Sequence, residues 1–517
     1  MAHITVIKLK IKKTPEEAFY FLSKKNYFCF LDSNLENNKY SNYSYLCFEP
    51  DFEVKSFGEI NEKIYFNEKK ISKHLCHPLE FISEIMKENI HFDFINKETK
   101  PTYSFYDENK DFYEEDASTF KNYFPGFKGG FIGYFSYDLK NYMEVLPDTV
   151  KDDLKLPYFN LLFFSKVFSY SHKEKCWYYM ESSQNKNNTP LSLNSIKSLA
   201  KKAKTVLGKE SLSISDKDIV KKIINKYLNL KIRKVKVRSN ILKKDYMSSV
   251  LKAKKYIHEG EIYQVNFTHR FSGAIPVEPS DFYYILRKVN PAPFSAFIAF
   301  PEVKIASTSP ERFILIKNDN IETMPIKGTR PRGENNSKDA LLKRELKGSI
   351  KDRAELNMIV DLERNDLGKF CKYGSIKVKQ HAVIEKYAKV FHSSSTITGK
   401  IKDQVTFSDI LKAIFPGGSI TGAPKIRAMQ IIDELENNAR SVYTGSIGYI
   451  GIDGTIDLNI AIRTIIIKNE NFYYNTGGGI VEDSDCEEEY LESLQKGKAL
   501  EEALKFFEFE NLSKLNL

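Results

Sequence analysis

The chain has 517 residues, of which 42% are hydrophobic and 28% charged, an ordinary composition for a globular protein of about two to four domain-sized units. Its 78 basic and 68 acidic residues are interspersed, so the net charge of +10 is too diffuse for a nucleic-acid footprint, which needs a concentrated basic stripe. The six cysteines form no Cys-x-x-Cys pair, no apolar run could cross a bilayer, and lysines interrupt the N-terminus where a secretion signal would be apolar. We therefore expect a cytoplasmic protein with reduced thiols that binds neither nucleic acid nor membrane.

Composition divides the chain into three regions, of which the first spans residues 1–180 and is rich in Phe and Tyr. Short aromatic and apolar runs predict strands at 43–48 and 161–170. Glycines punctuate an aromatic run at 129–134, which is typical of a strand that another backbone approaches closely.

The second region, residues 181–240, is dominated by Lys, Asn and Ser, and we interpret it as a connecting segment that carries helices. One helix is predicted at 216–230, where apolar residues from Ile219 to Tyr227 share a face. The densest basic run of the chain, 221–238, also lies here. It supports an alternative of another class, a basic scaffold or nucleic-acid binder, which salt-sensitive DNA retention without catalysis would reveal.

The third region, residues 241–507, mixes helices and strands without a regular βαβ alternation, which predicts an α+β fold rather than a doubly wound sheet. Apolar residues at helical spacing predict a helix that ends near Gly260, and further helices are expected at 339–363 and 484–507. Strands are expected at 262–271, 295–300, 312–316, 445–452, 458–467 and 472–476.

The most informative motif of this region is the glycine turn Pro-Ile-Lys-Gly-Thr-Arg-Pro-Arg-Gly at 325–333, which contains Lys327. Gly328 has no Cβ and lets the backbone come close to a ligand. The amine of Lys327 can act as a nucleophile if it is kept neutral, which burial and nearby positive charge favour. A solvated surface lysine beside a turn is the alternative, and the neighbouring motifs decide between the two.

Two pairs of acidic residues lie on predicted helices far apart in the sequence, Asp352 with Glu355 and Glu489 with Glu492. Each pair is spaced i and i+3, so its two carboxylates share a helix face. Carboxylates that converge from two helices repel one another unless a cation neutralises them, and Mg²⁺ suits an all-oxygen site. Exposed, solvated helix faces are the alternative, especially for the acidic run around Glu489.

Two glycine loops, at 416–425 and 477–480, offer backbone N–H groups to an anion. The first is not a phosphate-binding P-loop, because Lys425 does not directly follow the last glycine, and a carboxylate is the better candidate ligand. Arg463 stands in an otherwise apolar predicted strand. A buried arginine needs an anionic partner, which could be a structural acid or a substrate carboxylate.

Two further residues could transfer protons. Glu311 follows a predicted strand edge, and His392 lies in a mixed apolar and polar run. For each of them, an ordinary surface or core position is the alternative.

Taken in order, these motifs resemble the chorismate-utilising enzymes, a family that includes component I of anthranilate synthase and of aminodeoxychorismate synthase. The first region matches more loosely, at 30–33, 43–45 and 129–130. The resemblance implies a two-lobed, layered β-sheet sandwich with flanking helices, like that of anthranilate synthase component I. The matching segments of the third region are 262–266, 308–312, 325–333, 352–366, 416–425, 457–464 and 479–484.

The resemblance also implies a role for each matching residue. Glu355 and Glu492 would hold Mg²⁺, supported by Asp352 and Glu489, and the metal would grip the ring carboxylate of chorismate. The helix reads Glu-Leu-Asn-Met from Glu355, which departs from the common family pattern but keeps the ligand. The implied substrate-binding residues are Gln264, Gly328, Thr329, Thr421, Tyr443, Arg463, Gly479 and Lys496.

Two positions separate the subfamilies. Relatives that use water carry a lysine where this chain has Gln264, so the chain resembles an ammonia user. Anthranilate synthases usually carry alanine where Lys327 stands, whereas lysine resembles aminodeoxychorismate synthase component I. Lys327 would attack C2 of chorismate while Glu311 protonates the departing C4 hydroxyl and His392 orients groups or relays protons. Ammonia would then add at C4 and release the lysine, giving 4-amino-4-deoxychorismate for 4-aminobenzoate and folate.

No glutaminase segment with a nucleophilic cysteine is recognisable in the sequence. The resemblance therefore implies a separate glutamine amidotransferase subunit, component II, that supplies ammonia. Anthranilate synthase component I, which makes anthranilate for tryptophan, is the alternative within the same family.

Overall fold

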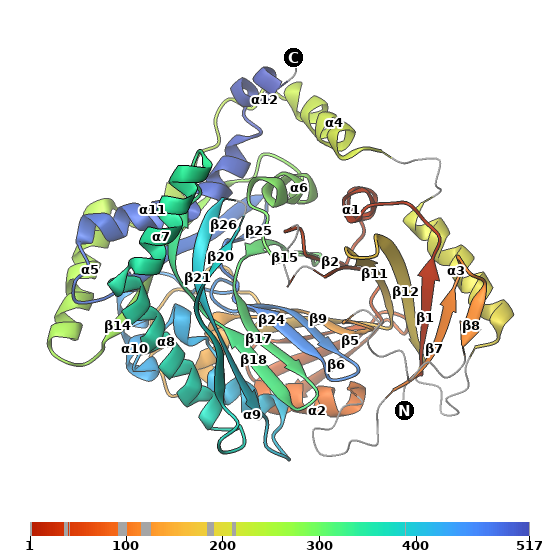
Figure 1. Cartoon of the computed structure of the whole chain (residues 1–517), viewed down its shortest axis with the longest axis horizontal. Coiled ribbons are helices and arrows are strands. Elements are labelled where there is room, and N and C mark those ends of the chain that lie inside the picture. Colours follow the sequence, from red (N-terminus) through yellow and green to blue (C-terminus); the bar gives the residue numbers. More distant parts are fainter. Residues whose placement is uncertain are drawn as a thin grey trace.

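The computed structural model describes residues 3–35, 40, 42–90, 101–114, 126–183, 191–208, 214–387 and 389–515. Two large β-sheets share a hydrophobic core, and helices flank them (Figure 1). Phe131 of one sheet and Val265 of the other belong to the same buried cluster, so the sheets pack against each other. This arrangement confirms the predicted α+β sandwich.

The first sheet has 14 strands in the order β13-β14-β26-β25-β16-β15-β2-β3-β11-β12-β1-β7-β8, with β22 paired to β14. The pairing of β1 with β7 is parallel, and the other neighbours are antiparallel. The strands are β1 (His3–Leu9), β2 (Phe28–Asp32), β3 (Tyr43–Cys47), β7 (Thr102–Asp107), β8 (Phe112–Glu114), β11 (Lys166–Ser171), β12 (Cys176–Ser183), β13 (Arg238–Ser239), β14 (Gln264–Ala274), β15 (Phe294–Ala299), β16 (Lys304–Ser309), β22 (Gly422–Ala423), β25 (Thr464–Lys468) and β26 (Asn471–Ile480).

The second sheet has 12 strands in the order β19-β21-β18-β17-β24-β23-β9-β10-β4-β5-β6, with β20 paired to β21. Its strands are β4 (Phe52–Ser56), β5 (Ile60–Tyr65), β6 (Lys70–Leu75), β9 (Gly130–Phe135), β10 (Phe159–Phe164), β17 (Arg312–Lys317), β18 (Asn320–Met324), β19 (Ile326–Pro331), β20 (Lys377–Lys386), β21 (Val390–Lys400), β23 (Ser446–Gly451) and β24 (Ile456–Asn459).

The helices lie outside the sheets, and α5, α7, α8, α10 and α11 gather at the left of Figure 1 around β14 and β21. None of the helices in the described ranges is long and apolar enough to cross a membrane. The helices are α1 (Pro15–Leu22), α2 (Pro78–Asn89), α3 (Leu193–Leu207), α4 (Asp216–Leu228), α5 (Lys243–His258), α6 (Pro279–Val289), α7 (Asn336–Gly348), α8 (Ile350–Gly368), α9 (Phe407–Ile414), α10 (Lys425–Leu435), α11 (Cys486–Lys505) and α12 (Phe509–Leu515), with short 3-10 helices η3 (Tyr137–Tyr142) and η5 (Gly418–Ile420).

The helix predicted at 339–363 is in fact two helices, α7 and α8, that are separated at Ser349. Ser349 has extended backbone angles, and its hydroxyl accepts a hydrogen bond from the Asp352 N–H at 3.2 Å. This is N-cap geometry, which starts a new helix direction. The break places Asp352 and Glu355 in the first turns of α8.

The strand predicted at 458–467 is also wrong in extent. β24 ends at Asn459 and β25 begins at Thr464, and the two strands belong to different sheets. The chain crosses between the sheets through the core, so Ile460 and Ala461 are buried without being in a strand. Buried crossover residues have the same apolar pattern as a buried strand, which periodicity cannot distinguish.

The first and third regions of the chain interleave within each sheet. β2 pairs with β15, and β9 pairs with β23. The second region contributes α3 and α4, whose apolar faces enter the second buried cluster. The division of the sequence at 180 and 240 stays a prediction.

Candidate active site

The Lys327 turn is held open by a bulge in β19. Lys327 pairs with Ser393 of β21 and Thr329 pairs with His392, so Gly328 is the extra residue. Gly328 has φ +77°, and a Cβ there would lie 2.9 Å from Cγ of Asp352. Only glycine allows α8 to approach the turn this closely.

Most of the Lys327 side chain is buried, unlike that of a solvated surface lysine. Its Nζ donates to Oε2 of Glu355 at 2.7 Å, and the two side chains are 16% and 17% exposed. A Cβ added to Gly479 of β26 would lie 2.9 Å from Nζ of Lys327 and 3.0 Å from Cδ of Gln264. The amine is therefore enclosed by α8, β14 and β26.

The second acidic pair faces the same space from α11. The Ser484 hydroxyl donates to Oε1 of Glu489 at 2.6 Å, and burial together with the charge of Glu492 raises the pKa of Glu489. Lys496 pairs with Glu492 at 2.6 Å and, with a contribution from Lys327, lowers the pKa of Glu492. Lys327 thus interacts with acids from both helices.

A second glycine of β26 makes room for these acids. A Cβ added to Gly478 would lie 2.9 Å from Oε2 of Glu489 and 3.8 Å from Oε1 of Glu492. Lys496 also donates to the Gly477 carbonyl at 3.0 Å. The glycine run at 477–479 therefore allows β26 to pass between α11 and Lys327.

The donor set predicted for Mg²⁺ fits that ion in its chemistry, since all four side chains offer carboxylate oxygens. Within the described ranges, however, no group of three or more His, Cys, Asp or Glu side chains is arranged to hold a metal ion. Cations of the protein balance three of these acids instead, because Asp352 pairs with Arg330 at 3.0 Å while Glu355 and Glu492 pair with lysines. The metal site stays a prediction.

Glu311 is a buried acid between β16 and β17, and only 4% of it is exposed. Burial raises its pKa to about 7, although hydrogen bonds to the carboxylate limit the rise. The Ser419 hydroxyl donates to Oε1 at 2.7 Å, and the Ile326 N–H lies 3.5 Å from the same oxygen. Because Ile326 precedes Lys327, the acid and the lysine are neighbours.

His392 is buried beside the same turn. Its Nδ1 lies 2.9 Å from the Thr329 hydroxyl, and the Tyr387 ring packs edge-on against the imidazole at 5.0 Å. Burial, reinforced by the charge of Arg463, lowers the pKa of His392 to about 3. The imidazole is therefore neutral, and it can orient groups or exchange a proton only as a neutral ring.

Arg463 lies in the crossover between the sheets with φ +52°. Within the described ranges, its guanidinium has no hydrogen-bonded or ion-paired partner, although Tyr443, Glu492 and Glu311 are close enough to influence its charge. Tyr443 is buried, which raises its pKa to about 12. An arginine without a paired acid is suited to an anionic ligand.

The glycine loop at 416–425 borders the candidate site through Ser419, which contacts Glu311. Thr421 is fully buried and donates to the Gly417 carbonyl at 3.0 Å, so its hydroxyl holds the loop together. Ser419 of the same loop contacts Glu311, a role that we did not assign from the sequence. The only sign of this role in the sequence is that Ser419 lies within the glycine-loop motif at 416–425. Gln264 is fully buried, and its amide has no partner within the described ranges.

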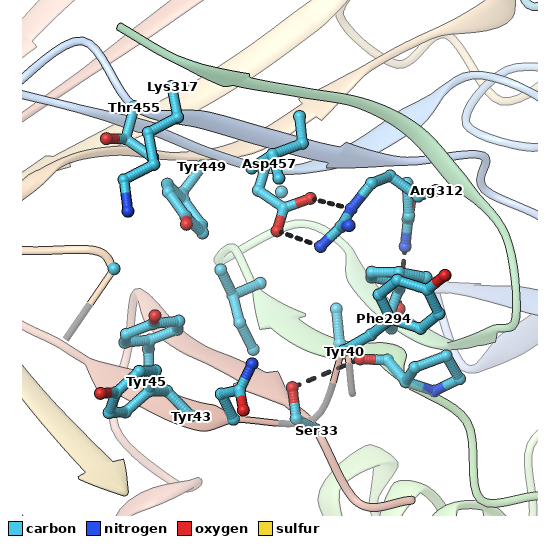
Figure 2. A pocket seen from close by; sticks show the side chains of 18 of the residues that line it. Ser33, Tyr40, Tyr43, Tyr45, Phe294, Arg312, Lys317, Tyr449, Thr455 and Asp457 are labelled. Atoms are coloured by element: carbon cyan, nitrogen blue, oxygen red, sulfur yellow. Dashed lines mark hydrogen bonds and ion pairs between the residues drawn. The ribbon is translucent and has the colours of Figure 1, made fainter. Parts of the chain in front are cut away.

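A separate cavity of about 520 Å³ lies between strands of the first and third regions, and none of the predicted site residues lines it. Figure 2 shows its aromatic walls, which include Tyr40, Tyr45 and Phe294. Arg312 makes two 3.0 Å hydrogen bonds to Asp457 at one side of it. Because Arg312 follows Glu311 in the chain, one end of β17 reaches both the cavity and the candidate site.

The chain is similar to known proteins in sequence and in fold. A family model of chorismate binding enzymes matches residues 66–502. Anthranilate synthase component 1 of Acetivibrio thermocellus is 39% identical over 381 residues, which are 74% of this chain and 76% of the relative. Aminodeoxychorismate synthase component 1 of Bacillus subtilis is 36% identical over 389 residues, 75% of this chain and 79% of the relative. The crystal structure of anthranilate synthase component I from Streptococcus pneumoniae matches with a TM-score of 0.69 and 28% identity, and covers 89% of this chain and 92% of that chain.

The chain therefore belongs to the family of chorismate binding enzymes. Its relatives divide between two component 1 activities at similar identity. The comparisons thus establish the family and do not choose between these two activities.

Proposed function

We propose that this chain is component I of an aminodeoxychorismate synthase, which converts chorismate and ammonia to 4-amino-4-deoxychorismate. The observation that carries the proposal is the enclosed amine of Lys327 beside the buried acid Glu311. An amine that can attack carbon and an acid that can protonate a departing hydroxyl are the two groups that this substitution needs. Lys327 is also the residue that distinguishes this activity in the sequence.

In the first step, the amine of Lys327, in its deprotonated form, forms a bond to C2 of chorismate while the C4–O bond breaks. Glu311 gives its proton to the departing oxygen, which leaves as water. A carboxyl group with a pKa near neutrality is protonated often enough to act as this acid and basic enough to recover the proton.

In the second step, ammonia forms a bond to C4 and the C2–N bond to Lys327 breaks. The proton lost by the incoming nitrogen returns to Glu311, and the lysine leaves as an amine. The sum of the two steps is chorismate plus ammonia giving 4-amino-4-deoxychorismate plus water, with the protein unchanged.

The two carboxylates of the substrate need separate partners. We assign the enolpyruvyl carboxylate to Arg463, Tyr443 and the Gly479 backbone, because the Arg463 guanidinium is unpaired in the described ranges. Mg²⁺ would be held by Glu355 and Glu492, with Asp352 and Glu489 in support, and would neutralise the ring carboxylate.

The ammonia would come from a glutamine amidotransferase subunit. The relatives are named component 1, which supports the existence of a second component in those proteins. We expect the isolated chain to accept ammonium salts in place of that subunit.

Anthranilate synthase component I is the second candidate. The 39% identity to such an enzyme and the TM-score of 0.69 to another favour it as strongly as the aminodeoxychorismate synthase relatives favour our proposal. It differs in adding ammonia at C2, where it would not need a lysine nucleophile.

One assay distinguishes the two. The chain is incubated with chorismate, Mg²⁺ and ammonium, a 4-amino-4-deoxychorismate lyase is added, and the aromatic product is separated by chromatography. The proposal predicts 4-aminobenzoate that appears only with the lyase. Anthranilate formed without the lyase would establish the second candidate.

A further inference from the structure

Arg440 and Glu436 form a buried ion pair that contacts segments of the candidate site. The side chains are 1% and 4% exposed, and their closest atoms are 2.6 Å apart. The guanidinium also lies 4.7 Å from the centre of the Tyr137 ring. Neither residue contacts Lys327 or the acids of α8 and α11.

Arg440 also donates to two backbone carbonyls of other segments. Nη2 donates to Asn266 at 2.6 Å, and Nη1 donates to Ile420 at 3.0 Å. Asn266 lies on β14, two residues after Gln264. Ile420 lies in the glycine loop between Ser419 and Thr421.

Arg440 also begins the turn that carries Tyr443, and Glu436 makes further contacts with β14. The Tyr443 N–H donates to the Arg440 carbonyl at 3.1 Å, which fixes the turn that carries Tyr443. Glu436 in turn accepts from the Thr268 N–H at 2.9 Å and from the Thr268 hydroxyl at 2.7 Å, so it secures β14 a second time. Two segments of the candidate site, β14 and the glycine loop, therefore meet at one ion pair, and the turn that carries Tyr443 begins at Arg440.

Stability alone is a weak reason for this arrangement. Replacing a buried ion pair with apolar residues of similar size is often neutral or stabilising, because desolvation offsets the attraction. A planar guanidinium, however, offers several donors in fixed directions and so sets the relative position of the groups that accept from it. Fixed spacing between β14 and the glycine loop is what the site needs.

We propose that Arg440, held by Glu436, is a positioning residue that sets the glycine loop so that the Ser419 hydroxyl reaches Glu311. The inference rests on the proposed role of Glu311 as the acid of the reaction. It assigns to Arg440 no contact with the substrate. Its effect passes through Ile420 and Ser419 to a carboxyl oxygen 2.7 Å from the serine hydroxyl.

This role has a consequence for pH dependence. The hydrogen bond from Ser419 favours the carboxylate form of Glu311, so weakening it raises the pKa of Glu311. Activity that needs the protonated acid then persists to higher pH. The titratable and charged groups near Glu311 on the surrounding elements are Lys327 on β19, Arg463 in the crossover, Glu363 on α8, and Tyr387 between β20 and β21.

The test compares Arg440→Lys and Thr268→Val with the unaltered chain, using chorismate consumption with ammonium from about pH 5.5 to about pH 9, which covers both sides of neutrality. We expect Arg440→Lys to lower kcat about 10- to 100-fold with little change in KM, as a small misplacement of catalytic groups does. We also expect the alkaline limb of the pH profile of kcat to move to higher pH. The same shift is expected for Ser419→Ala. Thr268→Val, which removes only one hydroxyl, shifts the limb in the same direction by less.

Arg287→Lys is the matched control. Arg287 is 3% exposed and pairs with Asp32 at 2.6 Å, so it is as deeply buried but belongs to another cluster. The Arg287→Lys variant should be less stable, but the alkaline limb of its kcat–pH profile should stay where it is in the unaltered chain. If the alkaline limb of the pH profile is unchanged in both Arg440→Lys and Thr268→Val, the inference is overturned. If Arg440→Lys does not fold, Thr268→Val alone decides. Product identity is measured separately, so anthranilate formation would defeat the proposed function without deciding the role of Arg440.

Discussion

The cavity of Figure 2 and the candidate active site differ in how their buried charges are balanced. In the cavity wall, Arg312 pairs with Asp457 at 3.0 Å and Lys128 pairs with Asp453 at 2.8 Å. In the candidate site, the Arg463 guanidinium and the Gln264 amide have no partners within the described ranges. Buried polar groups without partners are costly, and a bound ligand is one way to offset that cost.

The contrast is sharpest between two neighbouring residues. Arg312 makes a two-pronged contact with Asp457, whereas Glu311 receives one short hydrogen bond from Ser419 and keeps a pKa of about 7. One end of β17 thus carries a paired structural charge and the residue that we propose as the acid of the reaction. Incomplete pairing separates Arg463 and Gln264 from Arg312, whereas Lys327 is ion-paired with Glu355.

The largest expected effect comes from Lys327→Ala. Loss of the nucleophile should reduce 4-amino-4-deoxychorismate formation at least about 10³-fold while the fold is retained. Chromatography after addition of the lyase measures this, and circular dichroism checks the fold. Lys317→Ala, in the cavity wall, is the control and should keep full activity. Normal product formation by Lys327→Ala would defeat the covalent role.

Glu311→Gln should have the next largest effect. Removing a general acid typically costs about 10²- to 10⁴-fold, and here the loss should fall on kcat. In the unaltered chain, kcat should decline as the pH rises through about 7, because burial raises the pKa of Glu311 and only its protonated form donates. The Gln variant should lack this decline. A pH profile with the same limb in both proteins would contradict the assignment.

Arg463 and Arg312 should respond in opposite ways to replacement by Gln. Loss of Arg463 should raise KM for chorismate about 10- to 100-fold, since a hydrogen bond to a charged group contributes about 1.5–3 kcal/mol. Loss of Arg312 should instead lower the free energy of unfolding by about 3 kcal/mol or less, since Asp457 is left unpaired but is partly exposed. Steady-state kinetics and urea unfolding measure the two effects. Equal loss of stability in both variants would erase the distinction between the regions.

Glu355→Gln should have the smallest of these effects if its fold is intact. Loss of one carboxylate should raise the Mg²⁺ concentration for half-maximal activity about tenfold, with a parallel fall in turnover. Glu488→Gln, on the exposed side of α11, serves as the control. An unchanged Mg²⁺ titration in Glu355→Gln would remove this residue from the ligand set.

Much of the fold could be predicted from the sequence where the pattern is local. The α+β class follows from helix and strand patterns, and Ser349 shows the limit of this approach. It caps α8 through its side chain, although the pattern from 339 to 363 continues without a break. The crossover around Arg463 was predicted as strand because buried residues have the same composition in either conformation.

The candidate site could be predicted only where its residues belong to local motifs. Lys327 and Glu311 belong to recognisable motifs, whereas Arg440 does not. Its partner Glu436 stands four residues earlier, which looks like a surface helix pair. The contact that gives Arg440 its role joins it to the Ile420 carbonyl, 20 residues earlier, and a second contact joins it to Asn266, 174 residues away. Only the packing of the sheets brings such residues together.

The central claim is that Lys327 is the nucleophile, and trapping its adduct tests this most directly. The chain is mixed with chorismate and Mg²⁺ without ammonia, quenched, digested and examined by mass spectrometry. We predict a modification equal to chorismate minus water on the peptide that contains Lys327, and its absence in Lys327→Ala. An unmodified Lys327 peptide, from enzyme that makes 4-amino-4-deoxychorismate once ammonium is added, would contradict the account.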